Sequence, residues 1–269
     1  MTLSELYYNS LNSRLTLFNH AYFMKKTAKN NQSQLVILPG WSQDPATQSK
    51  WQPLVAQLEQ ADYQVLYLKL PGLTAPLDQV WQLADYRDWV LNQIKDFSNV
   101  VLIGHSFGGQ LAVSVAATNP VNLTAVVLIG PAGIIDRRWF KVAKRALFKL
   151  AAKWGGFLIG QTKSKRFFQN VLYQLAREKD YYLASPLLKQ TMVAVLSQEI
   201  IKDLPKIKHP ALIIWGKQDR ATPIHHAQIF NQQLEHSQLC VLPHENHCPH
   251  YHQPQRIARL IINFLTLPH

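Results

Sequence analysis

Six short apolar runs recur along the chain, and glycine, proline or a polar turn follows each one. They are QLVILPG at 34–40, YQVLYLKLPG at 63–72, NVVLIGHS at 99–106, LTAVVLIGPAG at 123–133, ALIIWGKQD at 211–219 and QLCVLP at 238–243. Short runs without alternating polar residues are typical of strands buried on both faces, as parallel strands are. The pattern therefore predicts six strands of a mostly parallel sheet.

Segments with the apolar spacing of helices separate these runs, as in WQPLVAQLEQ at 51–60 and YRDWVLNQIKDF at 86–97. Strands that alternate with helices form right-handed βαβ units, whose helices cover both faces of the sheet. The chain has 269 residues, of which 47% are hydrophobic, and this is enough for one large domain or one domain with an insertion. We expect an α/β fold with a central sheet flanked by helices.

The segment 134–204 breaks this rhythm, because it has helical composition and no run that predicts a strand. We interpret it as a helical cap, or lid, inserted into a core domain that consists of residues 1–133 and 205–269. The net charge of the chain is +12, and fourteen Lys and Arg against five acids between Gly133 and Leu204 contribute +9 of it.

Part of this charge lies in a predicted basic amphipathic helix at 137–154, with apolar residues on one side and lysine and arginine on the other. Its simplest interpretation is a cap helix with a solvated charged face. The alternative is peripheral contact with an anionic membrane surface or an anionic substrate. The basic residues accompany no recognisable nucleic-acid-binding module, so we expect no nucleic acid partner.

Composition also bears on the cellular compartment. No apolar run approaches the roughly 20 residues of a membrane-spanning helix, and the first thirty residues lack the pattern of a signal peptide. Cys240 and Cys248 form no CxxC pair, which indicates neither a disulfide framework nor a zinc site. The expectation is a soluble cytoplasmic protein without cofactor or metal.

The candidate chemistry begins at Ser106, within the G-x-S-x-G pattern GHSFGG at 104–109. A buried strand precedes the pattern and a small-residue helix follows it, which is the context in which such a serine serves as a nucleophile. Glycines two residues to either side leave room for a sharp, strained turn. We predict that Ser106 is a nucleophile, and a serine hydroxyl needs a base oriented by an acid.

An acid and a base are available further along the chain. Asp219 follows the strand at 211–216, at the carboxyl end of the sheet where sites of parallel α/β folds collect. The loop after the last strand, LPHENHCPHYHQPQ, holds four histidines at positions 244, 247, 250 and 252. A metal site is the weaker interpretation of this cluster, because the loop brings no cysteine pair. The residues alone do not decide which histidine is the base.

These motifs resemble those of the α/β-hydrolase superfamily, in the esterase-like branch with a Ser-Asp-His catalytic triad. GHSFGG is similar to the family's nucleophile elbow, WGKQD to its acid turn, NHCPHYHQPQ to its histidine segment and LPGW to its oxyanion loop. The resemblance implies a triad of Ser106, Asp219 and His247. It implies backbone oxyanion donors at Trp41 and Phe107, and supporting roles for Gly104, Gly108, His105 and His250.

The function implied by the resemblance is that of a serine hydrolase. Such an enzyme would cleave an ester or related acyl bond of a small or lipid-like substrate through an acyl-enzyme. A serine-dependent carbon–carbon bond hydrolase or a lactonase would use the same residues. A different class, a non-catalytic protein that binds a membrane surface with this fold, is the alternative suggested by the basic cap.

Overall fold

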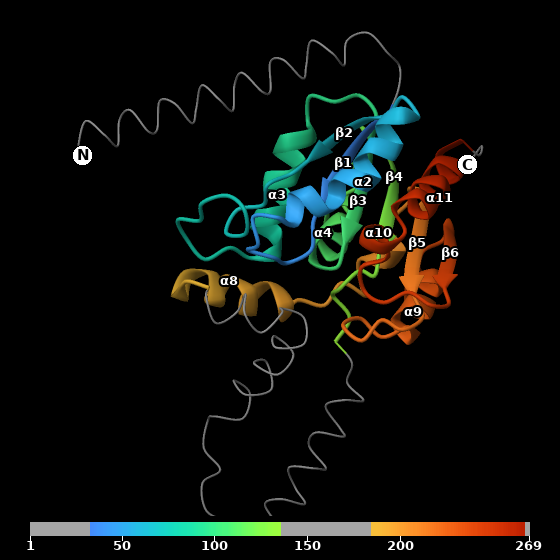
Figure 1. Ribbon diagram of the computed structural model, residues 1–269. Coiled ribbons are helices and arrows are strands. Elements are labelled where there is room, and N and C mark those ends of the chain that lie inside the picture. Colours follow the sequence, from blue (N-terminus) through green and yellow to red (C-terminus); the bar gives the residue numbers. More distant parts are fainter. Residues whose placement is uncertain (1–32, 136–183, 267–269) are drawn as a thin grey trace, which may run out of the picture. The chain divides into compact units, whose positions relative to one another are not determined.

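The computed structural model describes residues 33–135 and 184–266, which contain a six-stranded sheet (Figure 1). The strands are β1 (Gln34–Leu38), β2 (Gln64–Tyr67), β3 (Val100–His105), β4 (Leu123–Ile129), β5 (Ala211–Gly216) and β6 (Ser237–Leu242). They are arranged in the order β2-β1-β3-β4-β5-β6, and every pair of neighbours is parallel. All six strands predicted from the apolar runs are confirmed.

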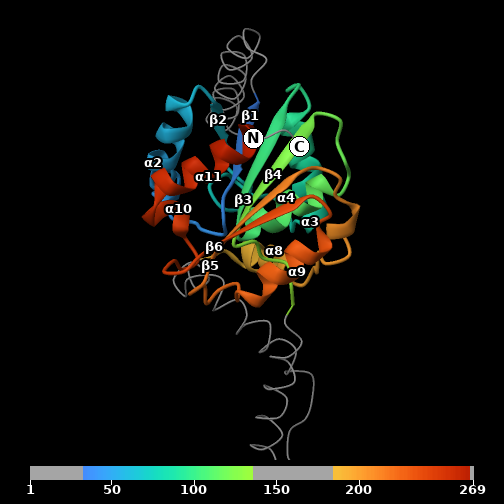
Figure 2. The same ribbon diagram turned by 90° about the vertical axis from the view of Figure 1, so that its right-hand side faces the viewer.

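Helices cover both faces of this sheet. They are α2 (Thr47–Gln60), α3 (Leu83–Ile94), α4 (Phe107–Ala116), α8 (Pro186–Leu196), α9 (His225–Gln233), α10 (Pro249–His252) and α11 (Pro254–Thr266), with a 3₁₀ turn η1 at Leu204–Lys206. Helix α2 packs against α10 and α11, whereas α3 packs against α4. Figure 2 shows the sheet between these two groups of helices, which confirms the predicted α/β architecture.

The main core lies between the sheet and the layer of α2 and α11. Side chains at alternate positions of β1 and β3, such as Leu35, Ile37 and Ile103, pack with Trp51 of α2 and Ile261 of α11. Strands β1, β3 and β5 are buried along their whole length, which explains their continuous apolar sequences. The edge strands β2 and β6 are only partly buried.

The order of the strands places a crevice beside β1 and β3. The chain runs from β1 outward to β2, and then returns to place β3 on the opposite side of β1. The connections that leave β1 and β3 diverge at this switch point, and ligands of such sheets bind at the carboxyl ends of the two strands. The segments after β1 and β3, with Gly40 and Ser106, lie at this position.

Only the last part of the predicted cap, 184–204, belongs to the described residues. Helix α8 is held against the core by Gln110 of α4, whose side-chain amide donates to the carbonyl oxygens of Val195 and Gln198. The predicted basic helix 137–154 lies outside the described residues, and the boundaries of core and cap stay predictions. Among the helices of the described part, none is both long and apolar enough to cross a membrane.

Candidate active site

Ser106 occupies a sharp turn between β3 and α4. Its backbone has a φ of 52° and a ψ of −115°, a conformation that L residues rarely adopt. Its N–H donates to the carbonyl oxygen of Ile129, and its own carbonyl oxygen accepts from the N–H groups of Gly109, Gln110 and Ala132 at 2.9–3.0 Å. These bonds to β4, to α4 and to the segment after β4 hold the strained turn in place.

The glycines around Ser106 are required by close backbone contacts. A Cβ atom at Gly108 would lie 1.9 Å from the carbonyl oxygen of Leu38, at the end of β1. A Cβ atom at Gly104 would lie 2.4 Å from the carbonyl oxygen of Gly108. Neither backbone group can move away as a flexible side chain would, so the turn tolerates no side chain at these two positions.

Asp219 and His247 form a pair at the carboxyl ends of β5 and β6. Oδ2 of Asp219 lies 2.7 Å from Nδ1 of His247. Of the four histidines in this loop, His247 is the one that the structure brings to Asp219. An imidazole that donates from Nδ1 to a carboxylate presents Nε2 as its acceptor, which is the tautomer that a general base needs.

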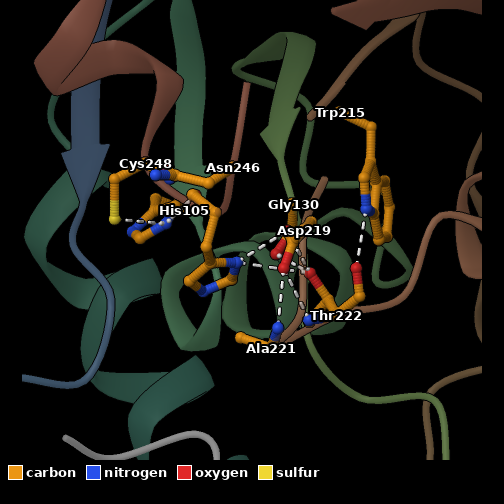
Figure 3. A network of polar contacts seen from close by, with 9 residues as sticks. His105, Gly130, Trp215, Asp219, Ala221, Thr222, Asn246 and Cys248 are labelled. Carbon is orange, nitrogen blue, oxygen red and sulfur yellow. Dashed lines mark hydrogen bonds and ion pairs between the residues drawn. The ribbon is translucent and has the colours of Figure 1, made fainter. Parts of the chain in front are cut away.

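The carboxylate of Asp219 is fixed by its own turn, as Figure 3 shows. Oδ1 accepts from the backbone N–H groups of Ala221 and Thr222, and Oδ2 accepts from the hydroxyl of Thr222 at 2.8 Å. Burial alone would raise the pKa of Asp219, but the hydrogen bonds from His247 and Thr222 outweigh burial and hold the pKa below its usual range. The group is therefore an anion at neutral pH.

Ser106 and His247 line one pocket of about 100 Å³. The other described residues of its wall are Gly40, Trp41, Ser42, Thr47, Lys50, His105, Cys248 and Tyr251. The wall is thus built from the segment after β1, the start of α2, the turn after β3, the loop after β6 and helix α10. This combination brings the predicted nucleophile and the predicted base to one cavity.

Of the two predicted oxyanion donors, Trp41 lines this pocket and Phe107 directly follows Ser106, which also lines it. Phe107 is the first residue of α4, so its backbone N–H has no acceptor within the helix. Trp41 follows the carboxyl end of β1, lines the pocket and packs edge-on against Phe107, with ring centroids 5.2 Å apart. The helix N-terminus adds a positive electrostatic potential, which stabilises a developing negative charge.

His105 connects the turn of Ser106 to the backbone of His247. Its Nε2 lies 2.9 Å from the carbonyl oxygen of His247, and the side chain is buried. Burial, together with the neighbouring His247 ring, lowers the pKa of His105 to about 3. The ring is therefore neutral, and its single N–H is assigned to Nε2 as the donor of this hydrogen bond.

His250 lies on the other side of His105, with the two ring centroids 4.4 Å apart. It is completely buried and packs on the indole of Trp51, and among the described residues neither of its ring nitrogens has a hydrogen-bond partner. Burial lowers the pKa of His250 well below its usual range. Within 33–135 and 184–266, no three His, Cys, Asp or Glu side chains are grouped so that they could hold a metal ion.

Several residues of the site escaped the sequence analysis. Thr222 holds Asp219, and its signal was the pattern of an acid followed three residues later by a hydroxyl in a turn. Gly130 has a φ of 48°, and a Cβ atom there would lie 3.0 Å from Oδ2 of Asp219. A Cβ atom at Gly216 would lie 2.2 Å from the carbonyl oxygen of Asn246. These glycines contact segments that are distant in the sequence, so a local sequence pattern cannot predict their role.

Comparison with known families agrees with this architecture. The model of the Alpha/beta hydrolase family matches residues 35–260, so the chain belongs to this family and is a hydrolase. A solved structure of a lipase-esterase related protein from Clostridium acetobutylicum has the same fold, with a TM-score of 0.62 and 22% identity. The match covers 87% of this chain and 96% of that one.

Curated relatives include esterases and carbon–carbon bond hydrolases. The chain is 26% identical to the pimeloyl-acyl-carrier-protein methyl ester esterase of Shewanella woodyi, over 80% of this chain and 87% of that protein. It is 22% identical to the 2-hydroxy-6-oxononadienedioate/2-hydroxy-6-oxononatrienedioate hydrolase of Comamonas testosteroni, over 86% and 87% of the two chains.

Proposed function

We propose that the protein is a serine hydrolase that cleaves an ester or related acyl bond of a small or lipid-like substrate through an acyl-enzyme. The observation that carries this proposal is the Asp219–His247 contact of 2.7 Å beside a pocket that Ser106 also lines. A structural glycine turn at Ser106 would not require a buried carboxylate oriented toward a histidine of the same pocket. The esterase of Shewanella woodyi among the relatives also supports it.

The mechanism follows from the roles of three side chains. His247 accepts the proton of the Ser106 hydroxyl through Nε2 while the Ser106 oxygen attacks the substrate carbonyl. The anionic Asp219 stabilises the imidazolium that forms, and the backbone N–H groups of Trp41 and Phe107 donate to the oxyanion. Collapse of the tetrahedral intermediate expels the alcohol, to which His247 returns the proton. Water, activated by His247, then releases the acid and restores Ser106.

The proposal is tested with p-nitrophenyl esters of increasing acyl length and with a fluorophosphonate probe. Ser106→Ala is expected to lower kcat by about a millionfold, because a triad without its nucleophile retains little catalysis. The wild-type protein should be labelled by the probe and Ser106→Ala should not. Ser197→Ala is the matched control, since Ser197 is exposed at the end of α8 and its hydroxyl donates to the carbonyl oxygen of Ala194. Equal turnover in wild type and Ser106→Ala would refute the proposal.

A second candidate, carbon–carbon bond hydrolysis, is favoured by the relative from Comamonas testosteroni, whose name gives such a substrate. The same three side chains would serve that reaction. Parallel assays with 2-hydroxy-6-oxononadienedioate and with p-nitrophenyl esters separate the two candidates. A kcat/KM for the diacid that is more than a hundredfold above that for every ester would assign the enzyme to the second class.

A further inference from the structure

Lys50 brings a cation to the wall of the pocket. It lies in the first turn of α2, and its side chain lines the same cavity as Ser106 and His247. Among the described residues of the wall, it is the only lysine, arginine, aspartate or glutamate. The proposed reaction with a neutral ester gives this cation no role, since the base, the acid and the oxyanion donors lie elsewhere.

The carboxylate of Asp44 holds Lys50 in this position. Nζ of Lys50 lies 2.6 Å from Oδ2 of Asp44, which is not part of the pocket wall. Asp44 is itself fixed in its loop, where its Oδ1 accepts from the N–H of Ala46 and its own N–H donates to the hydroxyl of Ser42. The loop therefore orients the ammonium group at the edge of the pocket.

The ion pair leaves Lys50 able to bind a ligand. The two side chains are 37% and 39% exposed, and attraction within such a solvated pair is weak. An ammonium group has three N–H donors, and the contact with Asp44 uses one of them. A substrate anion can therefore accept a hydrogen bond from one of the remaining N–H groups while Asp44 keeps its own contact with the ammonium.

We propose that Lys50 determines specificity by binding an anionic group of the substrate. The preferred substrates are then esters with a second, charged end, such as the monoester of a short dicarboxylic acid. This inference rests on the proposed function, because it places the ester at Ser106. The small volume of the pocket sets the anion only a few carbon atoms from the ester carbonyl.

The test compares p-nitrophenyl hydrogen adipate with p-nitrophenyl methyl adipate, in which a neutral methyl ester replaces the carboxylate at the far end. The readout is the ratio of kcat/KM for the charged ester to kcat/KM for the neutral one. Lys50→Met should lower this ratio about fivefold, as expected for loss of one partly solvated charge contact. Lys50→Arg should keep the ratio within about twofold. Added NaCl should lower the wild-type ratio, since salt screens the contact.

Two further variants sharpen the result. Asp44→Asn should raise the ratio, because the amide oxygen can still accept from the ammonium and hold its position, while the competing negative charge is lost. Lys208→Met is the matched control, since Lys208 also forms an exposed ion pair, 3.3 Å from Glu235, and does not line the pocket. It changes the net charge by the same amount and should leave the ratio unchanged. A Lys50→Met ratio equal to that of the wild type overturns the inference.

A binding measurement separates this inference from the proposed function. Monomethyl adipate is titrated into Ser106→Ala, with and without Lys50→Met, and binding is followed by tryptophan fluorescence, to which Trp41 of the pocket wall contributes. Lys50→Met should raise Kd about fivefold. Failure of the wild type to cleave any ester would refute the proposed function, and the two Kd values would still decide on Lys50. Equal Kd values overturn the inference even where esters are cleaved.

Discussion

Two histidines only three residues apart, His247 and His250, lie in opposite surroundings. His247 is partly exposed to the pocket, and its Nδ1 contacts a buried carboxylate at 2.7 Å. His250 is completely buried against Trp51, and its ring nitrogens have no hydrogen-bond partner in the part of the chain that the structure describes. His105 lies between them, with ring centroids 4.7 Å from His247 and 4.4 Å from His250.

The contrast shows that the surroundings of an imidazole decide its use. A histidine beside a carboxylate and open to a cavity can gain and lose a proton during turnover. A histidine inside an apolar layer stays neutral, because burial disfavours its charged form. The comparison predicts that substitution of His247 or of its partner Asp219 removes activity, whereas substitution of His250 changes stability.

The largest effect is expected at His247. His247→Gln should lower kcat by about a millionfold, since a triad loses nearly all of its catalysis with its base. Stability should change little, because the side chain is partly exposed at the pocket wall. The measurements are kcat with a p-nitrophenyl ester and urea unfolding. His244→Gln, at an exposed position of the same loop, is the control. Retention of more than a thousandth of wild-type kcat would contradict the role of general base.

The next effect is expected at Asp219. Asp219→Asn should lower kcat by about 10⁴-fold, because the amide no longer fixes the tautomer of His247 or stabilises its charged form. Asp203→Asn serves as control, since Asp203 forms an exposed pair with Lys206 at 2.7 Å. Pre-steady-state measurement of p-nitrophenol release reports the acylation step directly. A loss below tenfold would place the orienting acid elsewhere.

The sequence predicted the fold because its signals are local. Six apolar runs with turns behind them sufficed for the strands, and GHSFGG with WGKQD located the turns that carry Ser106 and Asp219. The resemblance to a family was needed to choose His247 among four histidines. The packing of His250 on Trp51 was not predicted, because it depends on how α2 sits against the last loop. The ion pair of Lys50 with Asp44 was not predicted, because it depends on how the loop after β1 turns into α2.

A smaller effect is expected at His105, whose ring lies between the rings of His247 and His250. His105→Phe removes the hydrogen bond to the carbonyl of His247 and should lower kcat about fivefold, the cost of one partly buried hydrogen bond of about 1 kcal/mol. His105→Gln keeps an N–H donor and should recover most of that loss. The pH profile of kcat/KM is recorded for both variants. Equal losses in the two variants would mean that the ring only fills space.

The smallest effect on activity, and the clearest one on stability, is expected at His250. Its folded pKa is depressed, so below pH 6.5 the unfolded chain binds a proton that the native protein does not, and stability falls as the pH drops. His250→Leu removes this proton uptake. Between pH 7.5 and pH 5 the wild type should lose about 2 kcal/mol more stability than the variant. Urea unfolding at both pH values measures this difference. An equal loss of unfolding free energy in the wild type and in His250→Leu would show that His250 is protonated in the native state.

The contact of Gly108 with the end of β1 affects how this enzyme can evolve. A single added methyl group at that position would collide with the carbonyl oxygen of Leu38. The backbone of the proposed nucleophile turn and the backbone at the end of β1 can therefore change only together. Ser42, Cys248 and Tyr251 are side chains of the pocket wall outside that contact. In a mutant library, variation of substrate preference should therefore concentrate at the wall, while the backbone that supports the reaction stays unchanged.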